Sequence, residues 1–171
     1  TFFFVLSGFI LTYTYGAVGR PLAARPFWGA RVARIVPVYF AAMLFAVPQF
    51  VHTVTRPEAG QPLPAVADVA GAAVTSVLML QAWFADYVCL WNCPSWSLSA
   101  EFFFYALFPW LVPFAMTRIG RASLFVATLA SVGLIAAGAT GLSVAPLAVA
   151  AGGATLNPLA RLPEFVAGIW L

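Results

Sequence analysis

The stretch Cys93-Pro-Ser-Trp-Ser-Leu-Ser-Ala-Glu-Phe-Phe-Phe-Tyr-Ala-Leu-Phe-Pro109 places serines and one carboxylate at the start of a long apolar segment. The carboxylate belongs to Glu101, and no other residue of the stretch is charged. A charged side chain at the centre of a membrane helix costs about 3 kcal/mol or more, so such residues are rare and face the protein interior. The sequence therefore indicates a functional site around Glu101.

Composition predicts the surroundings of this stretch. The chain has 171 residues, of which 63% are hydrophobic and 8% are charged. Because a membrane-spanning helix needs about 20 apolar residues, we expect an all-α fold, a polytopic transmembrane helical bundle with about five hydrophobic segments. All basic residues are arginines, which in a membrane protein indicate orientation and phosphate contacts rather than nucleic-acid binding.

Apolar runs and arginine-rich segments alternate along the chain. Several arginines gather in residues 20–34, and by the positive-inside rule this connection faces the cytoplasm. In the span that follows, Pro37 should lie near the first turn, where a missing N–H is harmless. The predicted spans are residues 1–18, 35–51 and 123–138 and a last one from near Arg161, and the predicted connections are residues 20–34, 52–68 (exterior) and 139–157.

Residues 69–85 leave two topologies open. If this segment crosses the membrane, the helix of residues 102–116 runs outward and leaves Arg118 and Arg121 outside, against the charge bias. If it is re-entrant and buried in protein, the Glu101 stretch is exterior and both arginines are cytoplasmic. The second interpretation is favoured because it satisfies the charge bias.

Four stretches together resemble one family. They are Phe3-Phe-Val-Leu-Ser-Gly-Phe-Ile-Leu11, Arg31-Val-Ala-Arg-Ile-Val-Pro-Val-Tyr39, Pro94-Ser-Trp-Ser-Leu-Ser-Ala-Glu-Phe-Phe-Phe-Tyr105 and Arg161-Leu-Pro-Glu-Phe-Val-Ala-Gly168. In this order and spacing they resemble the acyltransferase 3 family of integral membrane O-acyltransferases. The resemblance implies a protein that transfers an acyl group, often acetyl from acetyl-CoA, to a hydroxyl of a glycan or another exported molecule.

The resemblance also implies what the chain lacks. Members of that family carry an Arg and a catalytic-type His just ahead of the Phe-Phe-x-Leu-Ser-Gly-Phe motif, so the main catalytic histidine is expected upstream of Thr1. Residues 1–171 are therefore expected to form a partial transmembrane acyltransferase domain, truncated at both ends and inactive by itself. His52 does not match the position of the family histidine, and we expect it to be a polar residue at the membrane interface.

Arg31 and Arg34 are the candidate residues for binding the acyl-CoA donor. They lie three apart, so on a helix they share a face, and their guanidinium groups match phosphate oxygens. Their cytoplasmic placement agrees with a donor arriving from that side. The alternative is that they only set the topology and anchor lipid headgroups.

Glu101, Ser97 and Ser99 are the catalytic candidates. Glu101 could orient the missing histidine, pair with an arginine such as Arg161, bind the acceptor, or cap a helix as in a capping box. A serine nucleophile is disfavoured, since no base neighbours these serines and no Gly-x-Ser-x-Gly elbow is present. We expect Ser95, Ser97 and Ser99 to be hydrogen-bond donors that line a pocket.

Five further residues are candidates for contacting the substrate. Trp96 and Tyr105 could stack on a sugar or on acyl-CoA, or anchor the protein at the membrane interface. Arg161 and Glu164, three residues apart, could form an ion pair on one helical face, which lowers the free-energy cost of placing them in the membrane. These candidates are Trp96 and Tyr105, Arg161 and Glu164, and the amide of Asn92.

Two smaller predictions concern Cys89, Cys93, Ser7 and Gly8. The cysteines are four residues apart without nearby His or acid ligands, so no metal site is expected, and a disulfide between them is left open. Ser7 is expected to bond a backbone carbonyl within its own span, while Gly8 permits close helix approach.

The sequence thus predicts a membrane O-acyltransferase of a bacterial inner (plasma) membrane that modifies cell-envelope polysaccharides or similar acceptors. Acyl-CoA is the expected co-substrate, with no bound cofactor, and the partners are the carbohydrate or lipid-linked acceptor and membrane lipids. The alternative is a transporter or glycan-export protein that uses Glu101 and Arg161 as a charge relay or substrate clamp.

Overall fold

The computed structural model describes residues 2–16, 22–56, 62–139 and 156–171, and every regular element in these ranges is a helix. The all-α prediction is therefore confirmed for the described residues. The helices are α1 (Phe2–Tyr15), α2 (Ala24–Phe45), α3 (Val47–Thr55), α4 (Val66–Val77), α5 (Trp96–Met116), α6 (Arg118–Ala139) and α8 (Pro158–Trp170), with the short 3₁₀ helices η1 (Gln81–Trp83) and η2 (Cys93–Ser95) between α4 and α5.

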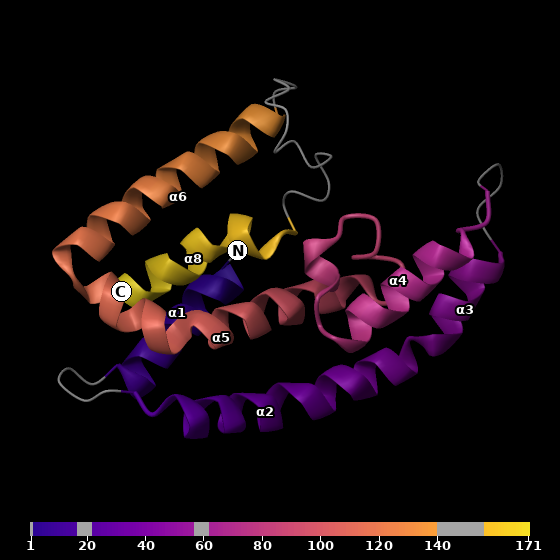
Figure 1. Cartoon of the computed structure of the whole chain (residues 1–171), viewed down its shortest axis with the longest axis horizontal. Helices are drawn as coiled ribbons and strands as arrows, with labels where there is room; N and C mark the ends of the chain where they lie inside the picture. The colour runs from indigo at the N-terminus through magenta and orange to yellow at the C-terminus, as the bar shows by residue number, and fades with distance from the viewer. Residues whose placement is uncertain (1, 17–21, 57–61, 140–155) are drawn as a thin grey trace.

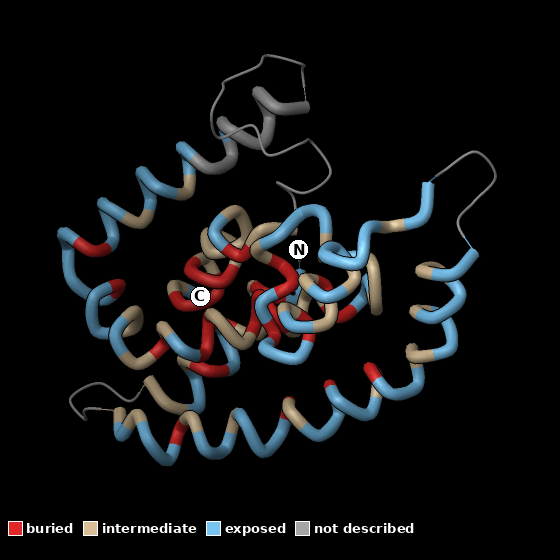
Figure 2. The backbone as a smooth tube through the Cα atoms, turned by 45° about the vertical axis from the view of Figure 1, so that its right-hand side comes forward, coloured by how far each residue is buried: buried red, intermediate tan, exposed pale blue. Residues whose placement is uncertain are grey.

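Helix α5 occupies the middle of the arrangement. Helices α1 and α8 lie side by side against it, while α6 and α2 lie on opposite sides of it (Figure 1). Figure 2 shows the buried residues gathered around the two chain ends, with the long outer helices mostly exposed. The packed centre is thus built by α1, α5 and α8.

A continuous row of aromatic rings joins these helices. Phe4 of α1 lies edge-on to Phe104 of α5 at 5.4 Å between ring centroids, and Phe104 stacks on Phe165 of α8 at 4.9 Å. Phe108, one turn further along α5, stacks on Phe27 of α2 at 5.2 Å. All five rings are almost completely buried, and each such pair adds about 1 kcal/mol beyond the area that it buries.

Two glycines allow α1 and α8 to touch through their backbones. A Cβ atom built on Gly8 would lie 2.1 Å from the carbonyl oxygen of Phe165, and one on Gly168 would lie 1.9 Å from the carbonyl oxygen of Val5. No side chain fits at these distances, so small residues are required where the helices cross. The close approach predicted at Gly8 is confirmed.

Among the described residues, two helical segments are long and apolar enough to cross a membrane, judged by length and composition: Ala24–Phe45 and Cys93–Met116. The expected count of about five spans is not confirmed. Helix α6 contains the predicted span 123–138, and the last predicted span corresponds to α8, whose N-terminus is capped by the Asn157 side chain, which accepts from the Leu159 N–H at 2.9 Å.

The prediction of a polar connection over residues 20–34 is wrong from Ala24 onward, because Arg25, Arg31 and Arg34 lie within α2. Arginine is a good helix former, and its long stem can pack along a helix while its head reaches polar surroundings. Pro37 consequently lies inside α2 rather than near its first turn. Residue 20 and residues 140–155, which cover most of the predicted connection 139–157, lie outside the described residues.

The predicted exterior loop 52–68 is also shorter than expected, since α3 extends to Thr55 and α4 begins at Val66. Residues 69–85 do not form one helix. Helix α4 ends at Val77, and the chain turns through Met79, whose φ of 57° is left-handed, before η1. The 12 residues of α4 span about 18 Å, well short of a membrane core of about 30 Å. Helix α4 is therefore too short to cross a membrane by itself, and a re-entrant course for this segment stays a prediction.

A candidate active site between α1, α2 and α5

A cavity of about 440 Å³ lies between α1, α2 and α5. Most of its walls are apolar side chains of α1 and α2. Its polar lining consists of Ser7 from α1, Arg31 and Arg34 from α2, and Glu101 and Tyr105 from α5. Three helices thus bring together the carboxylate and both arginines that the sequence singled out.

Glu101 is held by hydroxyl groups. The Ser7 hydroxyl donates to Oε1 of Glu101 at 2.9 Å, and the Tyr105 hydroxyl donates to the same oxygen. Glu101 caps no helix N-terminus and forms no ion pair with an arginine of the described residues. Helix capping and pairing with Arg161 are therefore not its role here. The prediction that Ser7 bonds a backbone carbonyl of its own span is wrong, because its hydroxyl reaches across to α5 instead.

Arg31 sits in an aromatic cage. Its Nη2 donates to the Tyr15 hydroxyl at 2.8 Å, and its Cζ lies 5.3 Å from the ring centroid of Tyr15 and 5.8 Å from those of Phe27 and Tyr105. Each such cation–π contact contributes about 0.5 to 2 kcal/mol, depending on how far it is removed from water. The cage holds the Arg31 charge in place at the cavity wall.

Arg34 lines the same cavity but is exposed, and its side chain makes no hydrogen bond to the described residues. The two arginines predicted to share a face therefore differ in freedom. One is fixed by aromatic rings, whereas the other keeps its donors available to a ligand.

A proline positions the backbone of Tyr105. Pro109 lies one turn further along α5 and has no N–H, so the carbonyl oxygen of Tyr105 lacks its usual helical partner. The indole Nε1 of Trp28 donates to that oxygen at 3.1 Å. A tryptophan of α2 thereby satisfies the carbonyl that the proline leaves open, and it fixes α2 to α5 beside the cavity.

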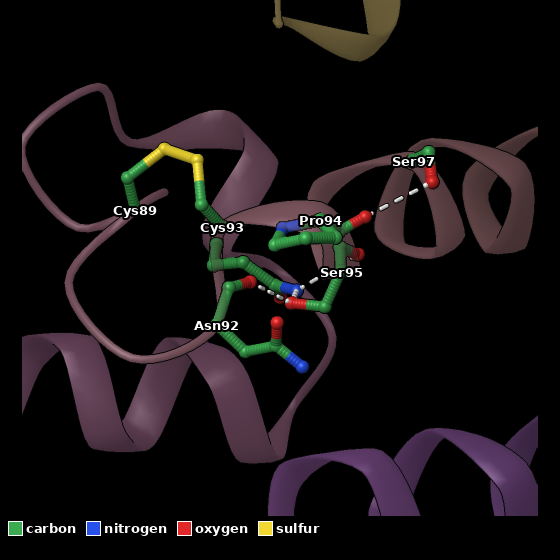
Figure 3. The surroundings of a disulfide bond; sticks show 7 residues. Cys89, Asn92, Cys93, Pro94, Ser95 and Ser97 are labelled. Atoms are coloured by element: carbon green, nitrogen blue, oxygen red, sulfur yellow. Dashed lines mark hydrogen bonds between the residues drawn. A yellow bond between two sulfur atoms is a disulfide. The ribbon is translucent and has the colours of Figure 1, made fainter. Parts of the chain in front are cut away.

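The segment before α5 is cross-linked. Cys89 and Cys93 form a disulfide, which answers the question the sequence left open, and Cys93 is the first residue of η2 (Figure 3). The Ser95 hydroxyl donates to the Asn92 carbonyl at 2.6 Å, and the Ser97 hydroxyl donates to the Pro94 carbonyl at 3.1 Å. These hydroxyls bond the local backbone and shape the start of α5.

Ser99 is likewise engaged with backbone. It is buried, and its hydroxyl donates to the carbonyl of Met79 at 2.6 Å, which ties α5 to the turn after α4. None of Ser95, Ser97 and Ser99 lines the cavity, and Asn92 does not line it either. Their proposed catalytic or substrate contacts stay predictions.

The remaining substrate candidates lie where α5 meets α8. Arg161 pairs with Glu164 at 2.6 Å between Nη1 and Oε1, as their spacing predicted, and Arg161 Cζ lies 5.9 Å from the ring centroid of Trp96. Trp96 in turn lies edge-on to Phe4. None of these side chains lines the cavity. A role for Trp96, Arg161 and Glu164 in binding substrate stays a prediction.

The catalytic histidine expected upstream of Thr1 also stays a prediction. Thr1 itself lies outside the described residues, and the described part of the chain begins with Phe2 at the start of α1. Among the described residues the single histidine is His52, which is exposed on α3 and does not line the cavity. The described residues therefore supply the carboxylate and the arginines of the site but no imidazole.

Sequence reasoning missed Ser7, Tyr15 and Trp28 as parts of the site. A polar residue inside an apolar run indicates a specific hydrogen-bonding role, and Ser7 is such a residue. The partner of Ser7 lies 94 residues away, however, and no local pattern reports such a contact. Tyr15 and Trp28 resemble ordinary interfacial aromatics in sequence.

The described residues thus define a helical chain with two helices of membrane-spanning length and a cavity that combines a carboxylate with two guanidinium groups. A family model described as an acyltransferase domain matches residues 1–171. The chain belongs to the acyltransferase 3 family.

One curated relative is the acyltransferase MdmB of Streptomyces mycarofaciens, which is 33% identical over 109 residues. The matched region covers 63% of this chain and 26% of the relative, so the chain matches about a quarter of that protein. No solved structure matches the chain.

Proposed function

We propose that the protein containing this chain is an integral membrane O-acyltransferase of a bacterial inner membrane. It moves an acetyl group from acetyl-CoA to a hydroxyl of a cell-envelope glycan or another exported molecule. Membership of the acyltransferase 3 family and the similarity to a protein named acyltransferase support acyl transfer. The two long apolar helices support the membrane location.

The reaction replaces a thioester by an ester. The acceptor oxygen attacks the acyl carbonyl, the C–O bond forms, and the C–S bond to coenzyme A breaks. The hydroxyl proton leaves to a general base and ends on the coenzyme A thiolate. This chemistry needs an acceptor for that proton or for its hydrogen bond, and cations for the phosphates of the donor.

The single observation that carries the proposal is the cavity, because it contains both a carboxylate that can accept a proton or hydrogen bond and cationic side chains for the donor phosphates. Arg34, exposed on its wall, and Arg31, fixed in its aromatic cage, provide the positive charge for the donor phosphates. Glu101 provides a carboxylate whose Oε2 forms no hydrogen bond to the described residues, while Oε1 is held by Ser7 and Tyr105. Oε2 accepts the hydrogen bond of the reacting hydroxyl, or of an imidazole base that approaches it.

The test is acetyl transfer by the full-length protein in membranes. Radiolabelled acetyl-CoA is supplied, and label is measured in envelope glycans and secreted products. Glu101→Gln keeps the shape of the side chain but removes its charge, and it should lower transfer about 100-fold, as loss of general acid–base assistance does. Asp68→Asn is the matched control, because Asp68 is exposed in the first turn of α4.

Three results are informative. Loss of label with Glu101→Gln and retention with Asp68→Asn support both the reaction and the site. Equal transfer by both variants keeps the reaction but contradicts the site. Absence of transfer from acetyl-, propionyl- and longer acyl-CoA donors contradicts the proposed function and favours the transporter alternative.

A further inference from the structure

We propose that the hydroxyls of Ser7 and Tyr105 are positioning groups that hold Oε1 of Glu101, so that Oε2 faces the reacting group. This inference rests on the proposed function. It gives a role to Ser7, which the sequence did not place in the site, and a new role to Tyr105, which the sequence named only as a candidate for contacting the substrate.

Both hydroxyls converge on one oxygen atom. Ser7 Oγ lies 2.9 Å from Glu101 Oε1 and 3.4 Å from the Tyr105 hydroxyl, and Tyr105 donates to the same Oε1. A carboxylate has two oxygens with about four acceptor sites. Since both donors use Oε1, the orientation of the carboxyl plane is fixed, and Oε2 is left for a ligand in the cavity that Glu101 lines.

The two donors come from rigid positions. Tyr105 lies four residues after Glu101 on α5, so the two side chains are neighbours on one helical face. Its backbone is further held by Trp28 through the carbonyl that Pro109 leaves open. Ser7 is adjacent in sequence to Gly8, whose backbone contact with α8 sets the position of α1. The carboxylate is thus oriented by elements that cannot easily shift.

Tyr105 has two separable parts. Its ring lies 5.8 Å from Cζ of Arg31 and belongs to the aromatic cage, whereas its hydroxyl serves Glu101. Tyr105→Phe therefore removes the hydrogen bond and keeps the ring beside the arginine. A positioning role predicts a fall in kcat with little change in the KM for acetyl-CoA, because the arginine end of the cavity is preserved.

The experiment measures acetyl transfer by the full-length protein with Ser7→Ala, Tyr105→Phe and Glu101→Gln, alone and combined. Each hydroxyl deletion should lower kcat about tenfold, the effect expected for one hydrogen bond to a charged group. The KM for acetyl-CoA should stay within about twofold, and Ser7→Thr, which retains a hydroxyl, should recover most of the rate. Neither deletion should lower kcat further when Glu101→Gln is already present, because both act through that carboxylate.

Tyr39→Phe is the matched control. Tyr39 is fully buried on α2, and its hydroxyl donates to the Ser76 carbonyl at 2.6 Å outside the cavity. This change should lower thermal stability and leave kcat per folded molecule unchanged. It distinguishes the effect on kcat of losing any buried hydroxyl from the effect of losing a hydroxyl that donates to Glu101.

The outcomes distinguish the two proposals. If the wild type is active and neither Ser7→Ala nor Tyr105→Phe lowers kcat, the positioning role is overturned and the proposed function stands. Deletions that still cost about tenfold in the Glu101→Gln background also overturn it, since they would then act independently of the carboxylate. A wild type without transfer from any acyl-CoA overturns the proposed function and the positioning role together.

Discussion

The two faces of α1 differ in how closely their neighbours approach. On one face, Gly8 lets the backbone of α8 come within contact distance, and Gly168 does the same in return. On the other face, the adjacent Ser7 borders a cavity and bonds a carboxylate of α5. The comparison teaches that the tightly packed face provides the fixed support, and that the open face carries the polar groups available for chemistry.

Breaking the packed face should have the largest effect. Gly168→Ala places a Cβ atom 1.9 Å from the carbonyl oxygen of Val5, so backbone must move, and we expect a loss of stability of about 3 kcal/mol or more. Gly29→Ala on α2 is the control, because a Cβ atom there meets nothing within 4 Å. Thermal unfolding of the purified full-length protein measures the difference. Equal melting temperatures of the two variants would contradict the close contact.

The disulfide before α5 should affect stability without affecting the cavity. Opening the Cys89–Cys93 loop by Cys89→Ser with Cys93→Ser frees a segment that is bridged in the structure, at a cost of about 2 kcal/mol for so short a loop. The KM for acetyl-CoA should be unchanged, since neither cysteine lines the cavity. In a full-length protein without other free thiols, maleimide should label Cys89 and Cys93 only after reduction. Labelling without a reductant would show that the bridge is absent.

Changing the α2 wall of the cavity that the open face of α1 borders should affect binding of the donor and not stability. Arg34→Ala removes an exposed cation from the cavity wall, and it should raise the KM for acetyl-CoA about tenfold, the effect of one lost charge-assisted hydrogen bond. Thermal stability should stay close to that of the wild type, because Arg34 bonds none of the described residues. Steady-state kinetics and unfolding of the same preparation test both statements. A loss of thermal stability with an unchanged KM would contradict our assignment of Arg34 to donor binding.

The smallest expected effect concerns the link between α2 and α5. Trp28→Phe removes the indole donor to the Tyr105 carbonyl and should cost about 1 kcal/mol of stability. Pro109→Ala in the same chain supplies a backbone N–H for that carbonyl and should recover part of the loss. Additive losses in the double variant, measured by thermal unfolding, would show that the carbonyl is not the point of contact.

The sequence predicted those features that depend on residue type alone. Glu101 could be identified because it is the single charge in an apolar stretch, and Gly8 because small residues mark close helix crossings. The start of α2 at Ala24 was missed because clustered arginines resemble a loop, although arginine favours helices. The bond from Ser7 to Glu101 could not be predicted, since it depends on how α1 and α5 pack across 94 residues of sequence.

The most direct test of the central claim asks whether the cavity between α1, α2 and α5 is where the acyl donor binds. Val38 lines the cavity with 65% of its surface exposed, and Leu44 on the same helix is 72% exposed but does not line it. Val38→Cys and Leu44→Cys, made in a full-length protein without other free thiols, are modified with a methanethiosulfonate reagent with and without acetyl-CoA. We predict that modification at position 38 abolishes transfer and is slowed by acetyl-CoA, while modification at position 44 does neither. Full transfer after modification at position 38, with no protection by acetyl-CoA, would contradict the account.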